Sequence, residues 1–191
     1  MAIPTHLHDA KLGRISADAF VFLAESGLLE DTDRVELCEG QIIEKPMQGF
    51  RHQFACEALE EVLMGRMPQP LRARANPSIR ISEKSVLDPD FAILSRSTAE
   101  IGRIPMAEEV VVVFEVGDST IDYDREDKRL AYAASGIPLF WLFDMPASQL
   151  LIYTEPKDGD YAQVQTYRGE DEIELPIIGG RVKVGIFFPR G

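Results

Sequence analysis

Two carboxylates and one lysine lie in a stretch of the chain whose other residues are apolar enough to be buried. Asp90 lies within an apolar run, Glu115 follows four valines and a phenylalanine, and Lys128 comes a short way further on. A carboxylate in an apolar strand costs free energy unless a cation or hydrogen bonds compensate it. Two such acids and an amine are the groups of a metal-dependent site that cleaves phosphodiesters, and the sequence predicts such a site here.

Each of these groups has a defined task in that chemistry. Asp90 and Glu115 are predicted to bind Mg²⁺ or Mn²⁺, with the carbonyl of Val116 as a neutral oxygen ligand. A metal in this position polarises a phosphoryl group and lowers the pKa of a bound water. Lys128 is predicted to orient that water or to stabilise the charge that develops during attack.

The same residues also allow a purely structural interpretation. Asp90 can belong to a turn, Glu115 can pair with Arg125 or Arg129, and Lys128 can be a solvated helix residue. Structural ion pairs place charges in such positions too. The spacing alone therefore leaves both interpretations open.

The elements expected around these residues bring them to one edge of a sheet. Residues 87–94 and 110–116 predict two strands, and the unbroken β-branched run of the second is typical of a central strand. Asp124 is predicted to be the N-cap of a helix, and residues 139–144 predict a further strand. Strand, helix and strand in this order predict a crossover between parallel strands. Lys128 then lies on the first helical turn, where phosphate is favoured.

The rest of the chain supplies the remaining layers. A helix over 17–26 and a helix over 51–67 are expected from their apolar spacing, and Glu39-Gly40 predicts the turn of a hairpin over 35–44. A strand over 72–81 is predicted to break near Asn76-Pro77. Short strands near 149–154, 161–167 and 181–184 predict an antiparallel meander.

Length and composition narrow the class of protein. With 191 residues, 45% hydrophobic and 27% charged, the chain is expected to form one domain over 15–191 after a tail over 1–14. No window is long and apolar enough for a membrane span, and no secretory signal is recognisable. Cys38 and Cys56 are too few for a disulfide framework and are predicted to be reduced thiols. The expected location is the cytoplasm.

The charge is unusual for a protein that handles nucleic acid. The formal net charge is −12, whereas affinity for phosphates comes mainly from Lys and Arg. Site carboxylates contribute to this number, and bound divalent cations would reverse the local field. DNA binding is therefore expected to be weak or to depend on a local basic strip, for which Arg72, Arg74 and Arg80 are the best candidates. A plain surface role is equally open to them.

A series of short motifs adds a resemblance to a known family. In order they are Glu36-Leu37-Cys38-Glu39-Gly40, His52 at the start of a helix, Pro89-Asp90, Val113-Phe114-Glu115-Val116, Lys128 with Tyr132, Gly136-Ile137-Pro138, and Phe140-Trp141-Leu142-Phe143-Asp144. Their joint order resembles the Uma2 family, also called DUF820, of restriction-endonuclease-like proteins in the PD-(D/E)xK nuclease superfamily. The resemblance covers nearly the whole chain from about Ile15.

The resemblance implies a role for five residues. Asp90 is similar to the first metal-binding aspartate and Glu115 to the second acidic ligand. The family lysine, displaced to the following helix, falls on Lys128. Glu36 matches an early glutamate that completes the metal site, and His52 matches an accessory histidine. One departure is the loop after the glutamate, which is Gly117-Asp118-Ser119-Thr120 in place of an apolar entry followed by Ser-Pro.

The resulting expectation is a single α/β domain with a restriction-endonuclease-like core, in which helices flank a central mixed β-sheet, plus a peripheral antiparallel extension. The implied activity is hydrolysis of DNA phosphodiesters with Mg²⁺ or Mn²⁺. Two alternatives remain open: a non-catalytic module that binds nucleic acid or protein, and a metallohydrolase of small phosphoesters. A homodimer is expected only from the prevalence of twofold assemblies.

Overall fold

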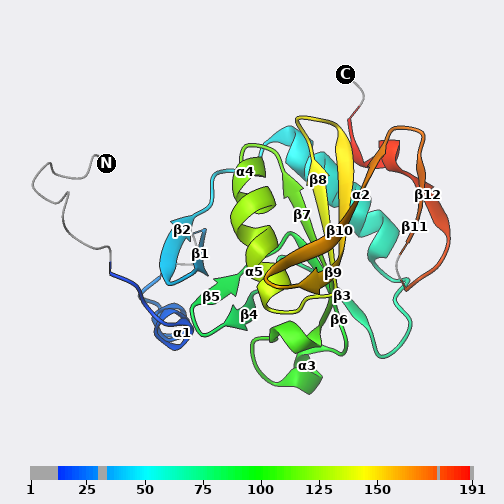
Figure 1. The fold of residues 1–191 in the computed structure, drawn as a ribbon. Coiled ribbons are helices and arrows are strands. Elements are labelled where there is room, and N and C mark those ends of the chain that lie inside the picture. The colour runs from blue at the N-terminus through cyan, green and yellow to red at the C-terminus, as the bar shows by residue number, and fades with distance from the viewer. Residues whose placement is uncertain (1–12, 30–33, 176, 190–191) are drawn as a thin grey trace, which may run out of the picture.

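The computed structural model describes residues 13–29, 34–175 and 177–189. The predicted tail over 1–14 lies almost wholly outside these residues. No helix in the described part is long and apolar enough to cross a membrane. The elements, drawn in Figure 1, follow in the order α1 (Ala17–Glu25), β1 (Val35–Cys38), β2 (Gln41–Glu44), α2 (Phe50–Leu63), β3 (Arg72–Ala75), β4 (Ile79–Ser82), β5 (Ser85–Leu87), β6 (Phe91–Leu94), α3 (Thr98–Ile101), η2 (Ala107–Glu109), β7 (Val110–Gly117), α4 (Ile121–Tyr123), η3 (Asp124–Lys128), α5 (Arg129–Ala134), β8 (Leu139–Asp144), β9 (Gln149–Lys157), β10 (Asp160–Arg168), β11 (Glu172–Glu174), β12 (Arg181–Lys183) and η4 (Val184–Phe187).

A six-stranded mixed sheet forms the centre of the fold. Its strand order is β10-β9-β8-β7-β6-β3. The pair β7 and β8 is parallel, as the strand–helix–strand pattern predicted, and the other four pairings are antiparallel. The valine run places β7 inside the sheet, with neighbours on both sides. The predicted fold class, a central mixed sheet flanked by helices, is confirmed.

Alternation along β7 divides the core between two faces of this sheet. Val112, Phe114 and Val116 pack in the cluster that contains the apolar side of α2, whereas Val113 packs with Tyr132 of α5. Successive side chains of a strand point to opposite faces, so Glu115 shares the face of Val113. Figure 1 shows α4 and α5 in front of the sheet and α2 behind it. The helix of the crossover therefore lies directly over Glu115.

A second sheet packs beside the first, and two expected strands divide between them. The strand expected over 87–94 is broken at Pro89, so β5 belongs to the four-stranded sheet β2-β1-β5-β4 and β6 to the central sheet. The strand expected over 72–81 is divided in the same way near Pro77, where Asn76 has φ 45°. Proline lacks a backbone N–H and interrupts a ladder, which explains why both breaks fall there. Asp90 consequently lies at a bend and not within a strand.

Two helix boundaries differ from those expected by more than one residue. α2 ends at Leu63, before the predicted limit at residue 67. The crossover helix begins at Ile121 with Thr120 at the N-cap position, so Asp124 is not the N-cap. It lies one turn inside, at the start of a π-helical turn over Asp124–Lys128 that continues into α5. Lys128 is therefore on the second turn, not the first.

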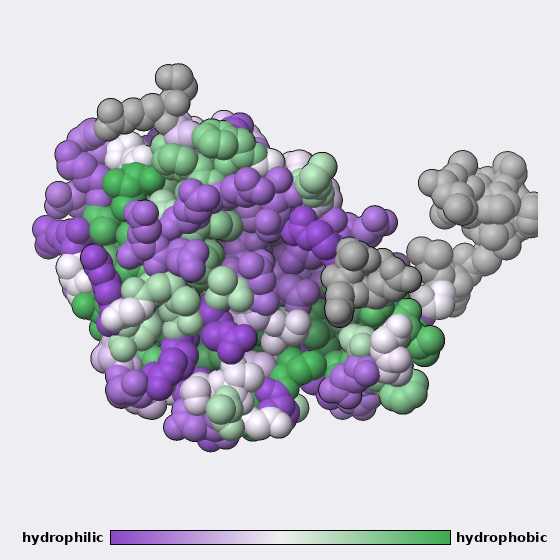
Figure 2. Space-filling view, turned by 180° about the vertical axis from the view of Figure 1, so that it is seen from behind, coloured by the Kyte–Doolittle hydropathy of each residue, from purple (hydrophilic) through white to green (hydrophobic). Residues whose placement is uncertain are grey.

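The C-terminal strands extend both the sheet and the covering layer. β9 and β10 extend the central sheet beyond β8 as an antiparallel meander, as predicted. β11 and β12 form a two-stranded hairpin, and Phe187 of η4 packs against Phe143 with ring centroids 4.9 Å apart. Figure 2 shows mostly hydrophilic side chains on the rear of the molecule, with smaller apolar areas between them.

Candidate active site

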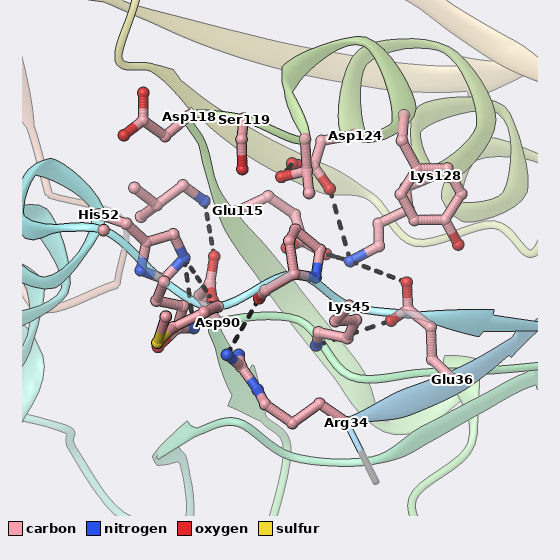
Figure 3. Close-up of a pocket in the computed structure, with 17 residues that line it drawn as sticks. Arg34, Glu36, Lys45, His52, Asp90, Glu115, Asp118, Ser119, Asp124 and Lys128 are labelled. Carbon is pink, nitrogen blue, oxygen red and sulfur yellow. Dashed lines mark hydrogen bonds and ion pairs between the residues drawn. The ribbon is translucent and has the colours of Figure 1, made fainter.

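One pocket contains every acidic, lysine and histidine residue that the sequence singled out for chemistry. Its empty space is about 470 Å³, part of it open to solvent. Figure 3 shows Lys128 and Glu36 at one end and His52 beside Asp90 at the other. The lining residues are Arg34, Glu36, Lys45, Pro46, Met47, Gln48, Gly49, His52, Asp90, Glu115, Val116, Asp118, Ser119, Thr120, Tyr123, Asp124 and Lys128.

The register of the central sheet brings the two principal acids together. β6 and β7 are antiparallel with Phe91 opposite Phe114, so Asp90 and Glu115 follow as the next opposed pair. Oδ2 of Asp90 accepts a hydrogen bond from the N–H of Val116 at 2.8 Å. The N–H and C=O of one strand residue point to the same side, so the carbonyl of Val116 also faces Asp90. Both acids are at least 95% buried.

Lys128 reaches into this space from the helix above the sheet. Its Nζ lies 2.9 Å from Oε1 of Glu115, 3.3 Å from Oε1 of Glu36 and 3.5 Å from Oδ1 of Asp124. Burial works against its charge, but the attraction of Glu115, Glu36, Asp124 and Asp90 dominates and raises the pKa of Lys128 well above its ordinary value. The amine is therefore a permanent cation.

Glu115 meets two donors and an excess of negative charge. Lys128 and the hydroxyl of Tyr132, at 2.6 Å, both donate to Oε1, and no hydrogen bond from the described residues ends on Oε2. Burial raises the pKa of Glu115 to about 8; Lys128 opposes this shift, and the charges of Asp124, Asp90 and Glu36 reinforce it. Oε2 is thus the oxygen with which Glu115 can bind a further cation.

Asp90 is held as an anion by a different set of contacts. Nε2 of His52 lies 3.0 Å from its Oδ1, and the amide of Gln48 lies 3.4 Å from the same oxygen. Burial alone would raise the pKa of Asp90, but hydrogen bonding and the charge of His52, the charge of Lys128 and the Val116 N–H together lower it. His52 comes from the first turns of α2, which places its ring over the bend that carries Asp90.

The donor set fits a hard divalent cation. Four buried carboxylates, those of Glu36, Asp90, Glu115 and Asp124, surround one buried lysine. Among the described residues, no donor gives a hydrogen bond to the buried Oε1 of Glu36, which has the ion pair to Lys128 at 3.3 Å. Burying more carboxylates than cations is costly, and carboxylate and carbonyl oxygens are the ligands that Mg²⁺ and Mn²⁺ prefer.

The three arginines of the expected basic strip lie elsewhere. Arg72 and Arg74 are on β3, at the edge of the central sheet, whereas Arg80 is on β4 of the other sheet. Arg80 pairs with Asp18 at 2.5 Å, and Arg74 donates to Thr98 at 2.9 Å. None of the three is among the described residues that line the pocket, where Arg34 and Lys45 accompany Lys128 as basic groups.

The arginine pairings of the structural interpretation do not form. Arg125 pairs with Asp144 and Arg129 with Asp160, so Lys128 is the cation beside Glu115. Asp124 belongs to this cluster, although the sequence predicts it only as a helix cap. Its spacing four residues before Lys128, typical of side chains that meet on a helix, was the available signal.

The loop that departs from the family pattern still closes the pocket. Asp118, Ser119 and Thr120 all line it, and the hydroxyl of Thr120 donates to Asp124 at 2.8 Å. A Cβ on Gly117 would lie 2.6 Å from Cδ1 and 3.0 Å from Cα of Ile121. A side chain at position 117 would therefore force Ile121 to shift where the chain turns from β7 into the helix that carries Lys128.

Comparison with known proteins agrees with the fold and the order of these motifs. A search of curated proteins found no match. A crystal structure from Anabaena variabilis ATCC 29413, of a "putative nuclease belonging to DUF820", aligns with TM-score 0.64 and 18% identity over 91% of this chain and 97% of its own. At that identity the likeness shows a shared fold. The family model for Uma2, described as "Putative restriction endonuclease", matches residues 19–184, and the chain therefore belongs to the Uma2 family.

Proposed function

We propose that this protein is a Mg²⁺- or Mn²⁺-dependent endonuclease that hydrolyses phosphodiester bonds of DNA. One observation carries the proposal: Nζ of Lys128 lies within 3.3 Å of a carboxylate oxygen of both Glu115 and Glu36. This contact lies at the end of the β6–β7 pair, next to Asp90. These residues are separated widely in sequence. One acid beside Lys128 would be enough for a salt bridge. The additional buried carboxylates carry negative charge that a divalent cation can compensate.

The residues of the pocket divide the work between binding and proton control. Asp90, Oε2 of Glu115 and the Val116 carbonyl would hold the metal, with Glu36 assisting. When bound, the metal supplies Lewis acidity toward a phosphoryl oxygen and a lowered pKa for water. Lys128 donates to Glu115 and carries a fixed positive charge beside the place where charge develops on the phosphate. His52 keeps Asp90 ionised and oriented by the contact at 3.0 Å.

The basic groups at the pocket support a phosphodiester substrate despite the overall charge of −12. Arg34 is exposed at the pocket, and Lys45 donates to the carbonyl of Asp88 at 2.7 Å while lying 3.8 Å from Glu36. Local cations of this kind can meet a DNA backbone where the remainder of the surface repels it. Affinity is expected to depend on the metal, whose charge offsets that of the carboxylates.

Plasmid nicking by the purified protein with Mg²⁺, Mn²⁺ or a chelator tests the proposal. Glu115→Gln preserves shape but removes a charged ligand, and Lys128→Ala removes the amine. We expect nicking to fall to background in the first and by about 10²–10³-fold in the second. Arg181→Ala, a change of an exposed residue on β12, serves as the matched control. Nicking that survives in both site variants would refute the assignment.

Two further measurements separate the rival functions. Calorimetry with Mn²⁺ should show binding by the wild type and a weaker response in Glu115→Gln; no binding by the wild type would favour a non-catalytic module. A chromogenic phosphodiester should be turned over more slowly than plasmid DNA, because it makes fewer contacts beyond the reacting phosphate than DNA does. Faster turnover of the small ester would favour a phosphoesterase.

A further inference from the structure

A second group of metal-ligating side chains meets the pocket at its His52 end. His52, Cys56 and Asp90 each offer one ligand atom, and these three atoms lie within 4.8 Å of one another. His52 and Cys56 are four residues apart on α2, so they share one face of the helix. Nδ1 of His52 lies 3.5 Å from Sγ of Cys56, and Nε2 lies 3.0 Å from Oδ1 of Asp90.

The types of ligand distinguish this group from the all-oxygen site beside it. Thiolate and imidazole select Zn²⁺ and other softer metals, whereas Mg²⁺ is held by oxygen. With Zn–N near 2.0 Å and Zn–S near 2.3 Å, a tetrahedral site separates nitrogen and sulfur by about 3.5 Å. The Nδ1–Sγ distance matches this value. Oδ1 of Asp90 contacts Nε2 at the opposite edge of the ring, so Asp90 must leave that contact to share a metal with Nδ1 and Sγ.

The pocket gives a metal ion access to these ligands from solvent. His52, Asp90 and Gln48 line the pocket, so an ion can enter from solvent and keep a water at its fourth position. Cys56 is half-buried against the core beside α2. Burial raises the pKa of its thiol, and the charges of Asp90 and Glu115 add to this shift, so the metal-free thiol is protonated. Binding of the metal releases that proton to water.

We propose that His52, Cys56 and Asp90 form an inhibitory site for Zn²⁺. Because Asp90 belongs to both ligand sets, Zn²⁺ bound through Cys56 withdraws Asp90 from the Mg²⁺ site that the proposed function requires. The proposed zinc site depends only on the positions of these three side chains. The proposed inhibition also depends on the nuclease function. The protein would thereby lose activity when free zinc rises.

Metal titration of the intact protein tests the site without any measurement of activity. Zn²⁺ affinity is measured by competition with a chromogenic chelator for the wild type, Cys56→Ser and Cys38→Ser. Serine keeps the hydrogen bond to His52 but is a poor zinc ligand, so affinity should fall at least about tenfold in Cys56→Ser. Cys38 lies in a separate core cluster with no place in the pocket lining, and Cys38→Ser should match the wild type.

Co²⁺ gives a spectroscopic check on the unmutated protein. A near-ultraviolet thiolate-to-cobalt charge-transfer band is expected for the wild type, and it should persist in Glu115→Gln, which removes the nuclease ligand and leaves the zinc ligands intact. If Cys56→Ser binds Zn²⁺ as tightly as the wild type, or if the wild type lacks the cobalt band, the zinc site is refuted.

The inhibition is tested separately from the binding. Zn²⁺ should suppress Mg²⁺-supported nicking by the wild type, and about tenfold more Zn²⁺ should be needed in Cys56→Ser. Zinc binding without any nicking activity would overturn the nuclease proposal and leave the site standing. If the protein is active and binds zinc through Cys56 but is not inhibited, Asp90 is not a ligand shared by the two metals.

Discussion

Nζ of Lys128 lies 2.9 Å from Oε1 of Glu115, although one residue comes from a helix and the other from the strand before it. Both side chains are almost fully buried. The contact requires that β7 and the helix over it keep a fixed distance and rotation. The crossover between the parallel strands β7 and β8 therefore positions the side chains of the pocket. The chemistry of the pocket depends on the stability of this strand–helix–strand unit.

Removal of the lysine should destabilise the metal-free protein. Lys128→Met leaves Glu115, Glu36 and Asp124 without their shared cation, and we expect a loss of about 3–5 kcal/mol in the free energy of unfolding by urea. Added Mn²⁺ should recover part of this loss because it compensates the same charges. Lys183→Met, at an exposed ion pair with Glu170, should change stability by less than about 1 kcal/mol. Equal effects of the two changes would contradict the arrangement.

Stability of the metal-free protein should fall as the pH rises. The pKa of Glu115 is raised from 4.5 to about 8 in the folded chain, so the folded state keeps a proton that the unfolded state releases. Its contribution is fully present below pH 4.5 and is lost as the pH rises toward 8. Urea denaturation at several pH values in a chelator measures this slope.

Glu115→Gln is the control for that slope, because glutamine cannot ionise. Asp88 and Asp124, whose pKa values burial also raises, act in the same direction and should leave a smaller slope in the variant. A slope of the same size in both proteins would show that Glu115 titrates normally.

Tyr132 should act on the site through Glu115. Tyr132→Phe removes the hydroxyl that donates to Oε1 at 2.6 Å, at an expected cost of about 0.5–1.5 kcal/mol in stability and with weaker Mn²⁺ binding. Tyr161→Phe is matched in kind, since its hydroxyl donates to the carbonyl of Ile137 at 2.8 Å, away from the pocket. It should lose similar stability and bind Mn²⁺ as the wild type does. Identical Mn²⁺ affinity in both variants would show that Tyr132 does not contribute to metal binding.

The turn at Gly117 should not accept a side chain. A Cβ there would press on the backbone of Ile121, and Gly117→Ala is expected to cost about 1–3 kcal/mol and to displace the helix that carries Lys128. Thermal unfolding and Mn²⁺ calorimetry measure the two effects. Gly13→Ala, with nothing within 4 Å of the new methyl group, is the control. A Gly117→Ala protein with normal stability would show that the turn has room to adjust.

The DNA contacts should follow the pocket rather than the arginine strip. Arg34→Ala should weaken DNA binding and reduce its dependence on salt concentration by about one ion, because one phosphate contact is lost. Arg80→Ala should leave both unchanged, since Arg80, on β4 of the other sheet, pairs with Asp18 of α1. Fluorescence anisotropy at several salt concentrations measures both. A larger loss of DNA affinity in Arg80→Ala than in Arg34→Ala would instead support DNA binding by Arg72, Arg74 and Arg80.

Local pattern was sufficient for much of the fold. The valine run predicted β7 as a central strand, and Glu39-Gly40 predicted the first hairpin. Ser16, just before the first expected helix, caps it by accepting a hydrogen bond from the N–H of Ala19. These features depend on residue-level preferences for burial, positive φ and side-chain capping, which are written in a few adjacent residues. The sequence also selected Asp90, Glu115 and Lys128 as residues with a chemical cost that some partner must offset.

Which groups offset the charges of Asp90, Glu115 and Lys128 was decided by the tertiary structure. Only the packing of the crossover helix over β7 brought Asp124 and Lys128 to Glu115, and only the pairing of β3 and β4 in different sheets separated Arg72 from Arg80. Likewise the approach of Cys56 and His52 to Asp90 joins a helix to a distant bend. Such contacts arise from long-range packing of whole elements, which no short window of sequence encodes, and they decide which charges meet.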